Sequence, residues 1–184
     1  MNAIRALALV ALLASCSSGT SSAGLPPAPI SETTRVTTGG GGTGQMSADQ
    51  SIVAHKGTVN AIIGSVWAVL PSVYDSLGIQ PSVSNAAAHQ YGNTGFEVRQ
   101  KLGSTMVTRL FDCGSNRGGS SAMSYDLFVT VLTTLEPGAG ATTNVSTVVE
   151  VKGKPITYSG DWVHCSSNGS LEQRILDGIT ARLK

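Results

Sequence analysis

Charged and aromatic residues are scarce in this sequence. Only 12% of its 184 residues are charged and 5% are aromatic, whereas soluble domains average about 25% charged residues. No run of like charge occurs, which excludes the basic stripe that a nucleic-acid-binding protein needs to displace counterions. The only continuous apolar run lies within residues 1–15, which excludes a multi-pass membrane protein. We therefore expect one modest domain with no nucleic-acid partner.

The apolar run at the start of the chain predicts export. Residues 1–15 read MNAIRALALVALLAS, with Arg5 as their single charge. The apolar core is about half of the roughly 20 residues that span a bilayer as a helix. Its length and flanks match a cleaved secretory signal peptide, and cleavage would leave a chain of net charge zero because Arg5 is removed.

The next residue refines this prediction. Leu13-Ala14-Ser15-Cys16 resembles the lipobox of bacterial lipoproteins, which implies that Cys16 is lipidated and becomes the new N-terminus. Ser17, where an Asp would imply retention in the inner membrane, implies an outer-membrane lipoprotein that faces the periplasm. The alternative is an ordinary signal peptide with an incidental cysteine. Two or more acyl chains anchor a protein stably, so the membrane is the first expected partner.

A tether and a single domain are expected after Cys16. Residues 16–31 are rich in Ser, Gly, Ala and Pro and lack apolar periodicity, as a flexible tether does. Residues 32–184 form the expected domain. Residues 32–46 either continue the tether or begin a hairpin whose second strand covers residues 47–54, and the hairpin is favoured. The glycine run of residues 39–44 is no phosphate-binding loop, because Gln45 and Met46 stand where Lys and Ser or Thr are required.

The two remaining cysteines predict a disulfide. Cys113 and Cys165 would lie in an oxidising compartment, where such pairs persist. A zinc site with His164, His55 and His89, or a catalytic thiol, is the alternative. Paired ligand spacings such as Cys-x-x-Cys are absent, so we favour the disulfide and expect no metal or cofactor.

Hydrophobic periodicity predicts an α+β fold. Spacings of three and four over residues 58–77 predict a helix that ends at Gly78. A second helix should begin at residue 170 with a capping box of Ser170 and Gln173, and its apolar stripe of Leu171, Ile175, Ile179 and Leu183 should lie on the sheet. Alternation of period two predicts strands at residues 83–89, 94–102, 106–113, 123–135 and 145–152, with a turn at residues 91–93. Both faces of residues 123–135 are fairly apolar, which predicts a central position for that strand. We expect an antiparallel sheet of four to six strands with two helices packed on one face.

The order of elements resembles a known fold. The helix that contains Val66-Trp67, its Leu77-Gly78-Ile79 end, the following strands and the closing helix resemble a helix-grip domain, in particular the repeated domain of BamC-like outer-membrane lipoproteins. This resemblance covers residues 51–102 and implies an accessory subunit of an envelope assembly. START-like ligand-binding domains share a similar Val-Trp helix entry, which implies a ligand pocket instead.

Two non-enzymatic functions are therefore expected. The first is a lipid-anchored scaffold or accessory subunit with an envelope protein partner, which requires a filled core and an exposed edge strand. The second is a periplasmic binding module for an apolar small molecule or lipid. It requires a cavity, with Trp67, Tyr74, Tyr91 and Phe96 as wall residues.

A hydrolase is the third hypothesis. Asp112, Asp161 and His164 lie close in sequence to the two cysteines of the expected disulfide, but no Gly-x-Ser-x-Gly elbow is present. Asp residues at such positions more often satisfy backbone groups of turns. We therefore expect no enzymatic activity.

Overall fold

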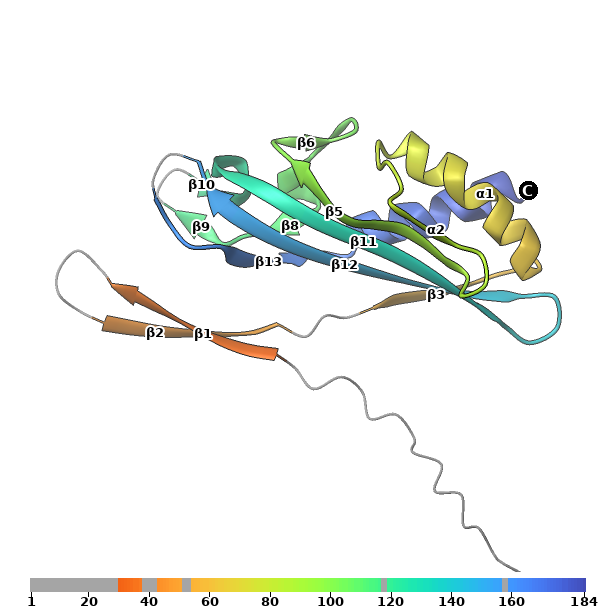
Figure 1. Ribbon diagram of the computed structural model, residues 1–184, viewed down its shortest axis with the longest axis horizontal. Helices are drawn as coiled ribbons and strands as arrows, with labels where there is room; N and C mark the ends of the chain where they lie inside the picture. Colours follow the sequence, from red (N-terminus) through yellow and green to blue (C-terminus); the bar gives the residue numbers. More distant parts are fainter. Residues whose placement is uncertain (1–29, 38–42, 51–53, 117–118, 157–158) are drawn as a thin grey trace, which may run out of the picture.

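The computed structural model describes residues 30–37, 43–50, 54–116, 119–156 and 159–184 (Figure 1). It confirms the α+β class, with a large antiparallel sheet and two helices. The sheet runs in the order β4-β5-β11-β12-β13-β8, and β3 pairs with the same edge of β12 as β13 does. It therefore has seven strands, one more than the upper number expected.

The centre of the sheet is a long hairpin. Strand β11 (Tyr125–Pro137) pairs along its whole length with β12 (Thr143–Pro155). Buried and more exposed side chains alternate along both strands, as the period-two pattern of the sequence predicted. On β11 the buried side chains are Tyr125, Leu127, Val129, Val131, Thr133 and Leu135. One face of the sheet therefore carries the core, and the other is open.

Shorter strands extend this hairpin on both sides. They are β3 (His55–Val59), β4 (Val83–Asn85), β5 (Gln90–Val98), β8 (Phe111–Asp112) and β13 (Val163–Ser167). Small two-stranded sheets form between β6 (Lys101–Leu102) and β7 (Thr105–Met106), and between β9 (Ser115–Asn116) and β10 (Gly119–Ser120). The 3-10 helices are η1 (Val107–Arg109) and η2 (Ser121–Ser124).

A further hairpin precedes the sheet. Strands β1 (Ile30–Thr37) and β2 (Thr43–Gln50) pair antiparallel with each other. The second strand begins earlier than the sequence predicted, and residues 51–53 lie outside the described residues. The predicted signal peptide and most of the predicted tether, at residues 1–29, also lie outside them.

The first helix starts later than predicted and ends where predicted. Helix α1 (Ile63–Ser76) follows β3, whose last two residues, Thr58 and Val59, were expected to be helical. β-branched side chains and pairing with β12 place that segment in the sheet instead. At the other end Gly78 has φ +75°. Its N–H donates to the Asp75 carbonyl at 2.9 Å, and the Ile79 N–H donates to the Tyr74 carbonyl at 3.0 Å. These two bonds form a Schellman motif, which only a glycine accommodates without strain.

The second helix is capped differently from the prediction. Helix α2 (Ser170–Arg182) begins after Gly169, which is the N-cap residue and has φ +82°. The predicted capping box is therefore wrong, because Ser170 lies one position too far along the helix. Asn168 takes part of that role, since its Oδ1 accepts the Ser170 N–H at 3.0 Å. The predicted apolar stripe is confirmed, with Leu171, Ile175 and Ile179 buried.

The turn predicted at residues 91–93 was also wrong, because those residues lie inside β5. The chain reverses at residues 86–89 instead, where Asn85 Oδ1 accepts the Ala88 N–H and His89 has φ +49°. Gly92 is required for a different reason: a Cβ atom there would overlap the Val131 carbonyl oxygen of the neighbouring strand. The strand predicted at residues 106–113 is instead the 3-10 helix η1 followed by the short strand β8.

Both helices pack on the same face of the sheet (Figure 1). They contact each other, and Arg182 of α2 donates to the Ser72 carbonyl of α1 at 3.1 Å. Leu176 of α2 lies so close over Gly57 of β3 that a Cβ atom on Gly57 would overlap it. The largest fully buried side chains are Tyr74, Phe111, Leu70, Ile79, Leu110, Leu127, Leu171, Ile175 and Ile179.

Candidate functional site

Three of the four predicted pocket residues form one aromatic cluster. The ring of Tyr91 meets Trp67 and Tyr74 edge to face, with centroids 5.8 and 5.1 Å away, and the His89 ring meets Trp67 edge to face at 6.2 Å. Tyr74 and Tyr91 are buried and Trp67 is half-buried. Phe96 lies further along β5, paired with Val129. Among the described residues no ring contact joins Phe96 to the other three.

The hydroxyl of Tyr74 links α1 to the sheet. It donates to the Tyr91 carbonyl at 3.2 Å and lies 2.8 Å from Thr133 Oγ1, which in turn lies 2.9 Å from Thr147 Oγ1. Burial raises the pKa of Tyr74 well above its usual value. The aromatic groups of this cluster thus contact one another and the sheet.

The predicted disulfide is present. Cys113, which follows β8, is bonded to Cys165 of β13. Cys165 is buried, and its sulfur lies against Gly153 of the next strand. The bond therefore fixes β8 to the main sheet through the neighbouring strand.

The predicted hydrolase residues lie on or next to two neighbouring strands, β8 and β13. Asp112 accepts the backbone N–H of Gly114 at 2.8 Å, the turn role expected for it. His164 lies exposed on β13. Within the described ranges no three His, Cys, Asp or Glu side chains lie close enough to hold a metal ion. Cys16 lies outside those ranges.

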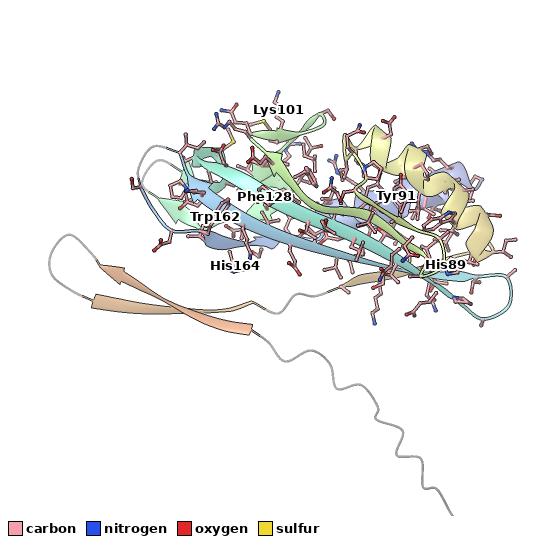
Figure 2. All side chains as sticks on the ribbon, viewed as in Figure 1. His89, Tyr91, Lys101, Phe128, Trp162 and His164 are labelled. Carbon is pink, nitrogen blue, oxygen red and sulfur yellow. A yellow bond between two sulfur atoms is a disulfide. The ribbon has the colours of Figure 1, made fainter. Side chains whose placement is uncertain are left out.

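The open face of the sheet carries a group of exposed apolar side chains that the sequence analysis missed. Phe128, Ile156 and Trp162 are 41%, 42% and 50% exposed, and they are three of the four large apolar side chains exposed in the described residues. The rings of Phe128 and Trp162 meet edge to face with centroids 6.2 Å apart, and Lys154 Nζ lies 5.8 Å from the Trp162 ring. We call these four residues the open-face patch. Figure 2 shows Phe128 and Trp162 side by side.

Strand alternation explains how the chain builds the open-face patch. Phe128 stands between the buried residues Leu127 and Val129 and so points to the other side of the sheet. Lys154 shares its side near the end of β12. Ile156 follows directly after that strand, where its N–H donates to the Ser124 carbonyl at 3.1 Å and so continues the pairing. The Phe128 ring lies over Gly95 of β5, where a Cβ atom would come within 2.7 Å of it. The absence of a side chain at Gly95 therefore leaves the space that the Phe128 ring occupies.

Charges of both signs surround the open-face patch. In the register of the sheet Glu97, Phe128, Lys152 and His164 form one row across four strands. Asp126, opposite Lys154, is held by Arg99 with Nε–Oδ1 2.6 Å, and this bond lowers the pKa of the Asp126 carboxyl. The patch is therefore apolar at its centre, with nearby lysines and nearby carboxylates.

A depression of about 290 Å³ lies near the other end of β12. It is lined by Lys56, Gly57, Thr58, Glu136, Asn144, Val145 and Ser146. Thr58 donates to Asn144 within it at 3.0 Å. Its walls combine one cation, one carboxylate and neutral groups, with no arrangement that points to a particular chemistry.

Comparison with known proteins adds no functional assignment. No protein-family model matches the chain, and no curated protein is significantly similar to it. In the described part of the chain neither helix has the length and apolar character needed to cross a membrane. The open-face patch is therefore a candidate site on the ground of its exposed apolar side chains alone.

Proposed function

We propose that this chain is a lipid-anchored protein of the bacterial cell envelope that acts as a non-enzymatic scaffold or accessory subunit. The lipid is carried on Cys16 after cleavage of residues 1–15. The domain faces the periplasm from the outer membrane and works through contacts with an envelope protein.

The Cys113–Cys165 disulfide is the observation that best supports export of the protein from the cytosol. Such bonds persist in oxidising compartments and are rare in the cytosol. The bond is independent of the lipobox, because it joins residues of the folded domain. Two features of different origin, a motif at residues 13–16 and a bond within the domain, thus support export.

The aromatic cluster favours the scaffold over a ligand-binding module. A pocket for an apolar molecule requires space between its wall residues. Here Tyr74 and Tyr91 are buried against each other, and Trp67 packs on Tyr91. An exposed edge is also present in the described structure. One edge of β5 pairs with β11, and on the opposite edge β4 pairs only with residues 90–92, which leaves residues 95–98 without a strand partner on that edge.

Native mass spectrometry of the chain extracted from envelopes separates the two functions. The scaffold predicts no small-molecule adduct on the domain and cross-links to a protein partner in intact envelopes. A retained apolar adduct that is lost in a folded Trp67→Ala variant would contradict the scaffold and favour the binding module. Phe128→Ala, which lies on the other face of the sheet, is the matched control and should leave any such adduct unchanged.

A further inference from the structure

We propose that the open-face patch rests on the lipid surface of the membrane to which Cys16 is attached. The proposal rests on the lipid anchor of the proposed function. It assigns the surface of the domain that faces the bilayer, through Phe128, Ile156 and Trp162.

The residue types of the open-face patch suit the interface between lipid and water. Tryptophan is enriched at that depth because its ring is apolar and its N–H is polar. Lys154 stands beside the Trp162 ring, and a lysine there can lay its stem along apolar groups and keep its ammonium among the headgroups. Phe128 and Ile156 add apolar surface on the same side of the sheet.

The size of the open-face patch favours a tethered contact over a stable protein interface. A stable protein–protein interface uses about 20–30 residues of all types on each side, whereas the open-face patch consists of four residues, three of them apolar. A weak contact becomes significant when both sites are linked, because short linkers give effective concentrations of roughly millimolar. The predicted tether before β1, residues 16–29, reaches at most roughly 50 Å when fully extended. The β1–β2 hairpin follows it and the sheet begins at His55, so the anchor keeps the domain within reach of its membrane.

The charges around the open-face patch predict how the contact responds to salt. Lys152 and Lys154 are offset by Glu97 and Glu150, and Asp126 is held by Arg99. The contact should therefore depend on the apolar side chains and persist in salt that screens exposed charges.

The two tryptophans of the chain supply a test with internal probes. The wild-type chain, as isolated from the bacterial envelope, is reconstituted into vesicles of phosphatidylethanolamine and phosphatidylglycerol with brominated acyl chains, which quench tryptophan on contact. Wild type and Trp67→Phe, which keep Trp162, should lose emission relative to vesicles without bromine. Trp162→Phe, which keeps only Trp67 on the helix-covered face, should lose much less. High salt should not restore the emission.

Matched variants separate the open-face patch from other exposed apolar groups. Phe128→Ser should reduce the quenching of Trp162. Ile62→Ser should not, although Ile62 is 60% exposed. Ile62 lies far from the open-face patch. It follows Val59, which pairs with the first residue of β12, whereas Ile156 of the patch follows the last residue of that strand. Far-UV circular dichroism checks that each variant is folded.

The outcomes distinguish the anchor from the open-face patch. A chain that does not float with the vesicles contradicts the lipid anchor and the inference with it. A chain that floats, but whose Trp162 is quenched no more than Trp67, overturns the inference alone. Protection of Trp162 from aqueous iodide without quenching by brominated lipid would also overturn it, since a protein or a second copy of the chain would then cover the patch.

Discussion

Phe128 and Trp162 meet edge to face on the open side of the sheet, 6.2 Å between ring centroids, although one belongs to β11 and the other precedes β13. The opposite side of the same strands carries the buried core. The sheet therefore has apolar side chains on both faces. Those on one face form the buried core, and Phe128 and Trp162 are exposed on the other.

The contact between Phe128 and Trp162 should be measurable as a coupling energy. Edge-to-face aromatic pairs contribute about 0.5–1.5 kcal/mol beyond the area they bury. A double-mutant cycle of Phe128→Ala and Trp162→Ala, followed by urea unfolding, should return a coupling in that range. Ile62→Ala in place of Phe128→Ala should show no coupling to Trp162→Ala, and coupling of equal size in both cycles would contradict the contact.

Loss of the disulfide should strongly lower the free energy of unfolding. The bond joins residues 52 apart, and closing a loop of this length stabilises a domain by about 4 kcal/mol in the chain-entropy model. Urea unfolding of the wild type with and without reductant measures the effect. The Cys113→Ala/Cys165→Ala variant is the control, because reductant should not change its stability. A wild type that is unaffected after verified reduction would be inconsistent with this role.

Two glycines should respond in opposite directions to alanine. Gly92→Ala places a Cβ atom against the Val131 carbonyl, a backbone atom of the neighbouring strand that cannot easily move, so it should destabilise the domain by about 1–3 kcal/mol or more. At Gly64, in α1, a Cβ atom meets nothing within 4 Å. Gly64→Ala should stabilise the domain by about 0.5–1 kcal/mol through helix propensity. Thermal unfolding of both variants checks the signs, and a tolerated Gly92→Ala would contradict the β5–β11 register.

Tyr74 should make the stability of the domain fall at high pH. Burial raises the pKa of Tyr74 in the folded state above the ordinary value of 10.0. The contribution of Tyr74 to the free energy of unfolding is therefore complete below pH 10 and is lost as the pH rises above that value. In that range the unfolded state releases a proton that the folded state keeps, which lowers the free energy of unfolding by up to about 1.4 kcal/mol per pH unit.

The Tyr74→Phe variant tests this dependence. Near pH 8 it should be about 1 kcal/mol less stable than wild type, because it lacks the hydrogen bonds to Tyr91 and Thr133. Between pH 10 and 11 the difference should shrink, since phenylalanine does not ionise. Guanidinium unfolding at each pH measures both values, and a constant difference would show that Tyr74 does not control the loss.

The sequence predicted those parts of the fold where one local pattern decides the structure. Strands β11 and β12 and helix α2 each bury one side against the core, and this gives their sequences a regular apolar pattern. The pattern is alternating in the two strands and a stripe in the helix. The glycine after α1 was predictable because a helix end needs a positive φ. Gly92 was misassigned to a turn, since its true requirement is the close approach of Val131 from a strand distant in sequence.

The candidate site was less predictable than the fold. Phe128 alternates with buried residues, so its position could have indicated an exposed ring, but the apolar character of both sides of that strand suggested only a central location. Trp162 lies outside any regular element, and no local pattern shows that it meets Phe128. Their contact depends on the pairing of β11, β12 and β13.

The anchor at Cys16 is the central claim, and an intact mass tests it most directly. The wild-type chain and a Cys16→Ala variant are expressed in a bacterium with two membranes, and each is purified from detergent-solubilised whole cells. We predict a wild-type mass that begins at residue 16, carries acyl chains and is two hydrogens lighter for the Cys113–Cys165 bond, and a variant without acyl chains. A wild-type chain that retains residues 1–15, or one that is cleaved elsewhere and bears no lipid, would contradict the account.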